Sequence, residues 1–401
     1  MTSTDFTAVS YPWRLFSGAH ALDNLSRVVA QCGSRRAFVI CGQSVATKTD
    51  LLSRIRDIVG ERYAGHFGTM RQEAPLDDVQ NAVAAAREAD ADMLIAVGAG
   101  TVIKATRVIA ILLAENAPPE RLMTQYPPSG PAVSPRLLAP KLPIVNVLTA
   151  ATSAQNRAGA AVKQTELGQR MEFFDPKTRP IAIFWDADAL LTAPPRLALN
   201  TGVAVYWRAL MNMGSIDSVN PLIEGERAQA LRLAERSLRR ITEHDALPRI
   251  EMCAAALLQN REEDEGRSFG NTHWVARVVY ALGASAFTLC DTLSQGEAYA
   301  SLTGASIRYF GERNIDGMVE IGHAIGFTNM QATPEGIASL ADAIDNSFRD
   351  RGMKLSLRDY GVTRDLLPRL LEFSMRNFNA DRDRKFLNER ELLLRTLEAA
   401  W

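Results

Sequence analysis

A short turn with two glycines is the first feature of this 401-residue chain that could take part in chemistry. The turn reads Gly98-Ala99-Gly100-Thr101 and follows an apolar run, 91–97, that predicts a strand; a helix is expected from 102 to about 115. At such a place, backbone N–H groups and the positive end of the helix dipole bind a phosphate or pyrophosphate, and glycine allows the close approach that a Cβ would block. The same kind of turn also occurs where a chain only reverses direction, so both interpretations stay open.

Two cations follow in the first turns of the expected helix. The helix dipole disfavours Lys104 and Arg107 there unless an anion lies close by, so they favour an anionic ligand at the turn. The alternative is that both side chains point into solvent. A second turn of small residues, Thr149-Ala150-Ala151-Thr152-Ser153, follows another run that predicts a strand.

Alternating segments surround these turns and must position them. Strands are expected at 36–42, 91–97, 143–148 and 181–186, and helices at 47–59, 76–89 and 102–115. Strands that alternate with helices of this length predict parallel βαβ units. From Pro194 onward the pattern is helical almost throughout. The sequence therefore predicts an α/β domain at 1–190 and an all-α domain at 191–401.

Composition argues against several classes of protein. The 45 Lys and Arg residues nearly balance 46 Asp and Glu residues, so the chain lacks the basic surface that nucleic-acid binding requires, and we expect no nucleic-acid partner. It has no run of about 18 apolar residues, so we expect no membrane partner. Residues 1–7 lack the pattern of a secretory signal, which makes the cytoplasm the expected location.

Other polar clusters are less informative. The charged run 261–265 (Arg-Glu-Glu-Asp-Glu) predicts a solvated loop between helices rather than a binding tail. The four cysteines show no CxxC spacing and the five histidines are scattered, so neither a zinc ribbon nor a disulfide framework can be recognised.

In their order along the chain, these features resemble the iron-containing (group III) alcohol dehydrogenase family, which includes the maleylacetate reductases. Residues 98–107 are similar to the family pattern GGGSxxDxxK, and residues 147–155 to its PTTAGTGSE turn. Residues 186–190 and 201–209 are similar to its segment DPxL...P...GxDAxxHAxE. The resemblance implies a Rossmann-like α/β N-terminal domain and an all-α C-terminal domain, the architecture of dehydroquinate synthase and the iron-containing alcohol dehydrogenases.

The resemblance also implies a nicotinamide dinucleotide in the first domain. The residues expected to bind it are Gly42 at the adenine ribose, Gly98, Ala99, Gly100, Thr101 and Lys104 on the pyrophosphate side, and Thr149, Thr152 and Ser153 on the nicotinamide side. Family members often carry, after the first strand, an Asp that accepts hydrogen bonds from the adenine ribose. Gly42 stands at this place, so the charge that would repel a 2′-phosphate is absent and both NAD and NADP remain open.

The metal ligands of the family have no counterpart in this chain. The family binds a divalent cation with one Asp and three His, and the first two are spaced i, i+4 on one helix. Those two positions are Ala204 and Arg208 here. The next ligand falls at Ala276, the usual catalytic histidine at Tyr280 and the last ligand near Gln295. Such a set cannot hold Fe or Zn, so we expect no metal.

Three residues are then the candidates for catalysis. Arg208 stays charged, and its planar fork can hold a substrate carboxylate or a developing oxyanion where the family has a metal. Tyr280 can deliver a proton if a cation lies nearby. His273 is a general acid if the alignment is shifted by one turn, and otherwise an ordinary residue at a helix start. Tyr206 is a weaker candidate.

Together these features predict a metal-independent, NAD(P)-dependent oxidoreductase that interconverts an alcohol and a carbonyl. Its expected partner is a small molecule or a peptide terminus with an anionic group. In one variant, a β-hydroxy acid is oxidised to a β-keto acid, which then loses CO2 in a tailoring step. The alternative is a non-redox protein, either a lyase or a non-catalytic partner in an assembly. A homodimer is expected because edge strands of open α/β sheets often pair.

Overall fold

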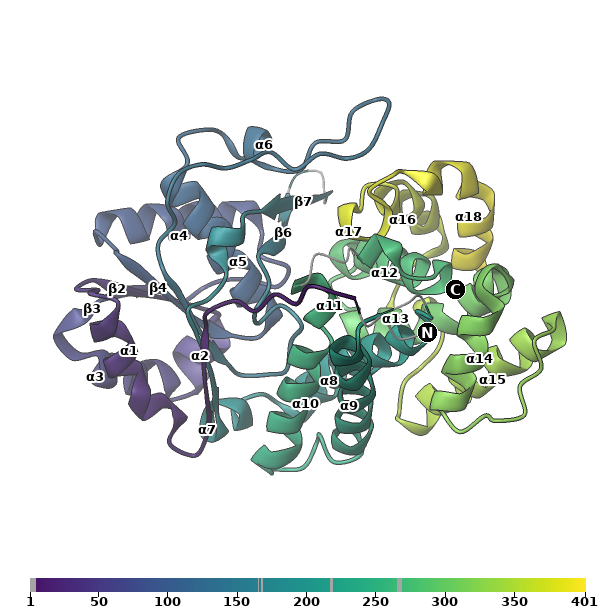
Figure 1. The fold of residues 1–401 in the computed structure, drawn as a ribbon. Helices are drawn as coiled ribbons and strands as arrows, with labels where there is room; N and C mark the ends of the chain where they lie inside the picture. The colour runs from purple at the N-terminus through teal and green to yellow at the C-terminus, as the bar shows by residue number, and fades with distance from the viewer. Residues whose placement is uncertain (1–4, 165, 167–168, 217–218, 265–268) are drawn as a thin grey trace.

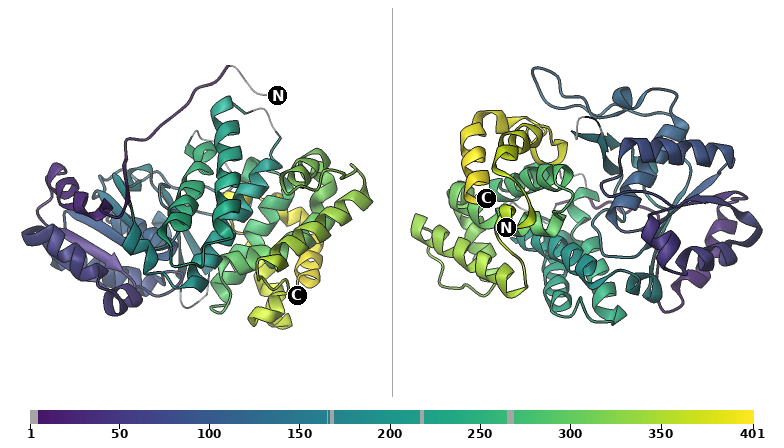
Figure 2. Two further views of the ribbon diagram at one scale, coloured as in Figure 1. Left: turned by 90° about the horizontal axis from the view of Figure 1, so that it is seen from below. Right: turned by 180° about the vertical axis from the view of Figure 1, so that it is seen from behind.

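The fold was analysed in a computed structural model that describes residues 5–164, 166, 169–216, 219–264 and 269–401. Strands and their covering helices form one side of the molecule, and a group of helices forms the other (Figure 1). The two further views in Figure 2 show the same division. The architecture is the α/β plus all-α arrangement that the sequence predicts.

A parallel sheet forms the centre of the first half. Its order is β1-β8-β5-β4-β2-β3. The strands are β1 (Arg14–Gly18), β2 (Ala37–Cys41), β3 (Tyr63–Phe67), β4 (Met93–Gly98), β5 (Ile144–Leu148) and β8 (Ala182–Asp186). Every residue of β2, β4, β5 and β8 is buried, as expected for a parallel sheet covered on both faces. This burial explains why these four strands appear as continuous apolar runs, whereas β1 and β3, which are partly exposed, were not predicted.

Helices cover both faces of the sheet. Ile95 on β4 belongs to the core under α1 (Leu25–Gln31) and α3 (Leu51–Val59). Its neighbour Leu94 belongs to the opposite core, under α4 (Leu76–Glu88) and α5 (Gly100–Ala114). The single helix expected at 47–59 is divided into α2 (Gln43–Lys48) and α3, because Thr49 has extended backbone angles.

Shorter elements connect these layers. An antiparallel hairpin of β6 (Gly159–Gln164) and β7 (Gln169–Phe174) lies between β5 and β8 in the sequence and was not predicted. The short helices are α6 (Pro119–Leu122) and α7 (Ala187–Leu191). The 3-10 turns are η1 (Ala21–Asn24), η2 (Gly60–Arg62), η3 (Pro176–Thr178), η4 (Phe269–Asn271), η5 (Gly311–Asn314), η6 (Leu357–Tyr360), η7 (Arg364–Leu366) and η8 (Lys385–Glu389).

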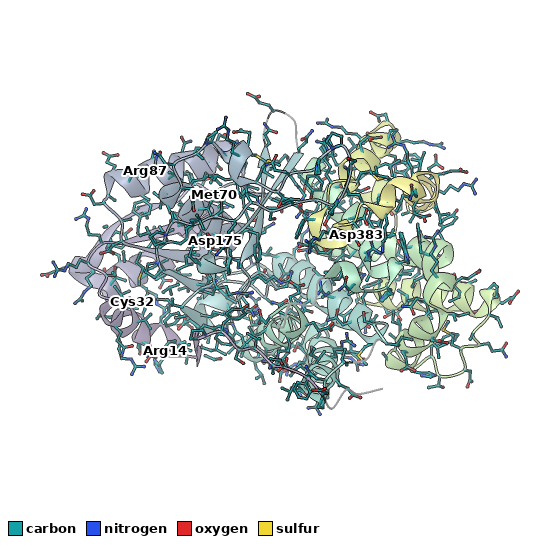
Figure 3. All side chains as sticks on the ribbon, turned by 45° about the horizontal axis from the view of Figure 1, so that its top comes forward. Arg14, Cys32, Met70, Arg87, Asp175 and Asp383 are labelled. Carbon is teal, nitrogen blue, oxygen red and sulfur yellow. The ribbon has the colours of Figure 1, made fainter. Side chains whose placement is uncertain are left out.

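The second half is helical in its described residues. Its helices are α8 (Pro195–Met213), α9 (Pro221–Leu238), α10 (Ala246–Leu258), α11 (Arg261–Asp264), α12 (Trp274–Leu289), α13 (Gln295–Phe310), α14 (Ile315–Ala324), α15 (Pro334–Asp350), α16 (Leu367–Ser374), α17 (Phe378–Asp381) and α18 (Arg390–Ala399). Asp383, which is labelled in Figure 3, lies between α17 and α18 in the sequence. No described helix combines the length and the apolar character needed to cross a bilayer. The boundary predicted at residue 190 falls within α7.

Candidate active site

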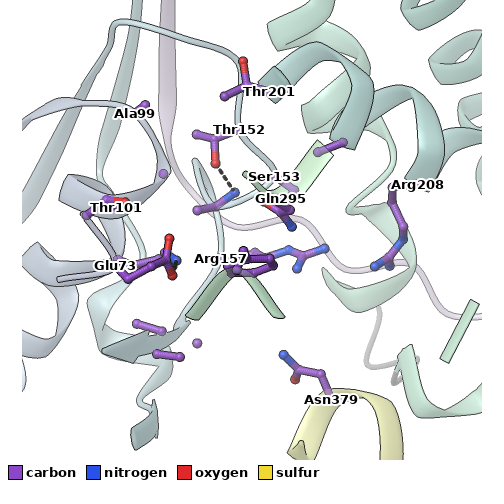
Figure 4. A pocket seen from close by; sticks show the side chains of 18 of the residues that line it. Glu73, Ala99, Thr101, Thr152, Ser153, Arg157, Thr201, Arg208, Gln295 and Asn379 are labelled. Carbon is purple, nitrogen blue, oxygen red and sulfur yellow. Dashed lines mark hydrogen bonds and ion pairs between the residues drawn. The ribbon is translucent and has the colours of Figure 1, made fainter. Parts of the chain in front are cut away.

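A cavity of about 1040 Å³ lies between the carboxyl edge of the sheet and the helical half. Ligands of open α/β sheets bind outside this edge. The wall on the sheet side includes the start of α5 and the turn at 151–154, and the opposite wall includes parts of α8, α12 and α13. Figure 4 shows Thr101 and Glu73 on one side of the cavity and Arg208 on the other, with Arg157 between them.

Six of the nine residues predicted to bind a dinucleotide line this cavity. They are Ala99, Gly100, Thr101, Lys104, Thr152 and Ser153. Ala99 is the N-cap of α5, and its side chain makes no capping hydrogen bond, so backbone N–H groups of the first turn remain for a ligand. A Cβ on Gly100 would come within 3.0 Å of Thr152 Oγ1. The close approach of these two turns therefore favours glycine, and the first turn of α5 could hold a pyrophosphate.

The other three predicted residues stand behind the wall and do not line the cavity. The amide of Thr149 donates to the carbonyl of Gly98 at 3.2 Å and thereby joins the two turns. A Cβ on Gly98 would lie 2.9 Å from the side chain of Val102. Gly42 is the N-cap of α2, where a Cβ would lie 3.2 Å from the carbonyl oxygen of Met70. These residues shape the turns rather than face the cavity.

The two cations on α5 have different surroundings from those expected. Lys104 lines the cavity, and its Nζ lies 3.4 Å from Glu73 Oε2, so the protein itself supplies an anion. Arg107 is buried and donates from Nη1 to the carbonyl of Gly159 at 2.7 Å. The alternative that Arg107 points into solvent is wrong, because Arg107 is buried on a helix that packs against β4 and β6.

Arg208 lies in the cavity wall opposite the glycine turn. Its Nη2 donates to Glu263 Oε1 at 2.9 Å and its Nε to Asn212 Oδ1 at 3.0 Å. The guanidinium lies 4.0 Å from the centre of the Phe269 ring. Burial lowers the pKa of Arg208, and Glu263 opposes this shift. Arg208 is therefore held rigidly with its charge next to the cavity.

The charged run at 261–265 is not the solvated loop that we expected. Its described residues form α11, and Glu263 and Asp264 point into the site. Glu263 Oε1 also accepts a hydrogen bond from Arg157 at 2.8 Å, and Asp264 Oδ1 accepts one from Arg179 at 2.9 Å. The segment is drawn inward because buried guanidinium groups require carboxylate partners. Glu265 lies outside the described residues.

We define the arginine cluster as Arg157, Arg179, Arg208, Glu263 and Asp264, all of which line the cavity. Burial alone would raise the pKa of Glu263, but Arg157 and Arg208 outweigh burial and lower it. Three guanidinium groups meet two carboxylates, so the ionised cluster has one positive charge in excess. The cavity wall therefore attracts anions at this point.

Tyr280 belongs to the same wall. Its ring lies 4.8 Å from that of Phe269, which links it to Arg208, and Asn379 Nδ2 donates to its hydroxyl at 3.3 Å. Tyr299 lies behind it, with ring centres 6.3 Å apart, and accepts a hydrogen bond from Gln295 at 2.8 Å. Burial raises the pKa of Tyr299. Of the two phenols, the less buried Tyr280 is the better placed to exchange a proton with a ligand.

His273 and Tyr206 do not line the cavity. His273 is the buried N-cap of α12: Nδ1 accepts from the amide of Ala276 at 3.3 Å, and Nε2 lies 2.9 Å from the carbonyl oxygen of Met211. Burial lowers the pKa of His273 to about 4. Tyr206 is buried with its ring 6.3 Å from that of Phe348. Both ring nitrogens of His273 are thus used by the backbone, which favours the helix-start role over the general acid.

The residues at the family's metal positions do not fit a divalent cation. Ala204 offers a methyl group, Arg208 a guanidinium, Tyr280 a phenol and Gln295 an amide that already binds Tyr299. Ala276 is buried and does not line the cavity. The described residues contain no group of three His, Cys, Asp or Glu side chains that could hold a metal ion.

Sequence reasoning missed Arg157, Glu263 and Phe269, which complete the surroundings of Arg208. Arg157 follows the second small-residue turn, and a cation after such a turn carries no recognisable motif. Glu263 was hidden in a charged run that is usually solvated. Arg170 on β7 was also missed; it lines the cavity, and its electrostatic neighbours include Glu172, Glu73 and Tyr280.

Residues 12–187 match the sequence profile described as iron-containing alcohol dehydrogenase. Maleylacetate reductase 2 of Cupriavidus pinatubonensis is 28% identical over 235 residues, which cover 59% of this chain and 54% of that protein. Long-chain-alcohol dehydrogenase 1 of Geobacillus thermodenitrificans is 24% identical over 361 residues, which cover 88% and 86%. The match thus spans about half the length of the first relative and most of the second.

Solved structures share the whole fold. The crystal structure of NADH-dependent butanol dehydrogenase A from Thermotoga maritima superimposes with a TM-score of 0.83 at 17% identity, covering 100% of this chain and 99% of that one. In the profile match over residues 12–187, in these relatives and in the fold, the chain is similar to the iron-containing alcohol dehydrogenases.

Proposed function

We propose that this protein is an NAD(P)-dependent oxidoreductase that interconverts an alcohol and a carbonyl on an anionic substrate, without a bound metal. The observation that carries the proposal is the arginine cluster, which has a positive charge in excess in the same cavity as the open N-terminus of α5. A cation fixed at this point performs electrostatically what a Lewis acid does, because both stabilise negative charge on oxygen.

The glycine turn and the neighbouring turn would bind the dinucleotide. N–H groups at the start of α5 suit the pyrophosphate, and Thr152 and Ser153 lie beside it in the cavity wall. The similar protein named butanol dehydrogenase A is described as NADH-dependent, and the similar aldehyde reductase is described as NADPH-dependent. Gly42 bears no carboxylate to repel a 2′-phosphate, so we propose NAD or NADP.

Arg208 would hold the anionic group of the substrate. Two of its nitrogens are engaged by Glu263 and Asn212, and no described residue is recorded as accepting a hydrogen bond from Nη1. Arg157, which shares Glu263, adds positive charge at the same place. Relatives named maleylacetate reductase and sulfoacetaldehyde reductase act on compounds that carry acidic groups.

Tyr280 would exchange the proton. Oxidation of an alcohol removes a hydride, which a nicotinamide accepts when bound, and a hydroxyl proton, for which the protein must provide an acceptor. Tyr280 lines the cavity, with its ring 4.8 Å from that of Phe269, on which Arg208 packs. Its phenolate form would accept the proton. In the reverse direction the same group donates the proton to the carbonyl oxygen.

One form of the proposal specifies the substrate as a β-hydroxy acid. Its oxidation gives a β-keto acid, which loses CO2 without a Lewis acid.

The proposal is tested by incubating the protein with a chelator, with NAD or NADP, and with matched pairs of β-hydroxy acids and neutral alcohols. Reduction of the nucleotide is followed by its absorbance. Reduction of the nucleotide with acids alone supports the proposal. A requirement for added divalent metal contradicts it, and failure to bind either nucleotide favours the non-redox alternative.

A further inference from the structure

Arg107 is a buried cation whose side chain the candidate active site does not use. It lies on α5, is 1% exposed and donates from Nη1 to the carbonyl of Gly159 at 2.7 Å. Its Nε and Nη2 are buried and have no hydrogen-bond partner among the described residues. Buried N–H groups of native proteins nearly always have an acceptor, so these two donors require one.

A second guanidinium with a free donor lies near Arg107. Arg179 donates from Nη1 to the carbonyl of Asn156 at 3.1 Å and to Asp264 at 2.9 Å, whereas its Nε is buried without a partner among the described residues. Tyr11 covers this guanidinium, with the ring centre 3.8 Å from Cζ. The two arginines thus flank the segment 156–159 and together have three donors to satisfy.

The electrostatic surroundings of Arg107 are also unbalanced. The charged groups that act on it are Arg157 and Arg179, both cations. Burial, Arg157 and Arg179 lower the pKa of Arg107 to about 9, so it remains protonated at neutral pH. A buried charge is unfavourable unless it is paired, and removing the proton is not an alternative for Arg107 at this pH. An anion supplied from outside the protein would pair this charge and accept from the free donors.

We propose that Arg107 and Arg179 bind a small inorganic anion, a halide ion, beside the segment 156–159. The anion has to be small because Arg107 does not line the cavity, so a substrate carboxylate held there does not reach it. A halide accepts several N–H donors at once and would satisfy the charge and the free donors together. The site shares Arg179 with the arginine cluster but does not include Arg208, which is proposed to hold the substrate.

The first experiment measures thermal unfolding of the protein in sodium chloride, bromide and gluconate at equal ionic strength. Gluconate is too large for the site and controls for general salt effects. We expect a saturable rise in Tm with chloride and bromide that gluconate does not give. In Arg107→Met, which keeps most of the side-chain volume and removes the charge, the halide-specific rise should disappear.

Arg249→Met is the matched control. Arg249 is also buried, donates from Nη1 to two carbonyls, at Leu190 and Ala193, and has a free Nε, but among the described residues no other arginine shifts its pKa. Its substitution should leave the halide effect unchanged.

Crystals of the unmodified protein grown in bromide give the direct answer, even if Arg107→Met does not fold. An anomalous peak within hydrogen-bond distance of Arg107 Nε or Nη2 is expected. Density for water alone, or equal Tm values in all three salts, overturns the proposal.

Discussion

Arg208 on α8 donates to Glu263 on α11 at 2.9 Å, in the part of the cavity where the family pattern places metal ligands. Glu263 accepts from Arg157 through the same oxygen, so one carboxylate serves two guanidinium groups. A single carboxylate cannot neutralise both. The ion pair therefore fixes the position of Arg208 and leaves positive charge for a ligand.

Substituting Arg208 should impair use of anionic substrates selectively. In Arg208→Met, we expect kcat/KM for a carboxylate-bearing substrate to fall by about 10²–10³, because a charged hydrogen-bond donor to the substrate is lost. A neutral alcohol should lose less than about threefold. Steady-state kinetics on the two substrates measure the difference. Arg236→Met, which breaks an ion pair with Glu251 away from the cavity, is the control and should change neither value. Equal losses on both substrates would show that Arg208 only supports the fold.

Removing the hydroxyl of Tyr280 should slow the chemical step. Tyr280→Phe keeps the ring contact with Phe269 and should lower kcat by about 10²–10⁴, the usual contribution of a general acid or base. Nucleotide affinity, measured by nicotinamide fluorescence, should stay within about threefold. Tyr206→Phe removes a phenol outside the cavity wall and should keep full activity. The role of Tyr280 fails if its variant retains the unmodified kcat.

The approach of the two turns should limit nucleotide binding. Gly100→Ala places a Cβ 3.0 Å from Thr152 Oγ1, so the side chain of Thr152 or one of the turns must shift by a few tenths of an ångström. We expect the Kd for NADH or NADPH to rise about tenfold, a loss of about 1.4 kcal/mol. The control is Gly225→Ala on α9, because a Cβ at Gly225 has no atom within 4 Å. This variant should bind the nucleotide with an unchanged Kd. An unchanged Kd in Gly100→Ala would place the pyrophosphate elsewhere.

His273 should govern stability rather than the pH dependence of catalysis. Its folded-state pKa is lowered to about 4, so between pH 6.5 and pH 4 the unfolded chain binds a proton that the folded chain does not. Stability therefore falls as the pH drops through this window, by about 2–3 kcal/mol from this group. His273→Asn retains a capping side chain, and urea unfolding at pH 7 and pH 4.5 should show a smaller acid-induced loss than in the unmodified protein. A loss of kcat of a hundredfold or more at pH 7 would instead restore His273 as a catalytic acid.

The architecture was largely predictable from the sequence, and the surroundings of Arg208 were not. Buried parallel strands such as β4 and β5 produce apolar runs, and the spacing of helices between them indicates the sheet. The glycine turn was found because its chemistry depends on backbone geometry that few residue types permit. Glu263 could not be found in this way, since a carboxylate in a charged run looks the same whether solvent or a buried arginine is its partner. His273 likewise offers one residue type for two roles, and only the hydrogen bonds to Ala276 and Met211 distinguish them.

The most direct test of the central claim is a joint measurement of metal content and nucleotide affinity on one purified preparation. Plasma mass spectrometry gives the metal per chain, and nicotinamide fluorescence gives the Kd for NADH and NADPH. We predict tight binding of at least one nucleotide with far less than one equivalent of iron, zinc or any other divalent metal. One equivalent of metal per chain would contradict the account, and so would the absence of binding by both nucleotides.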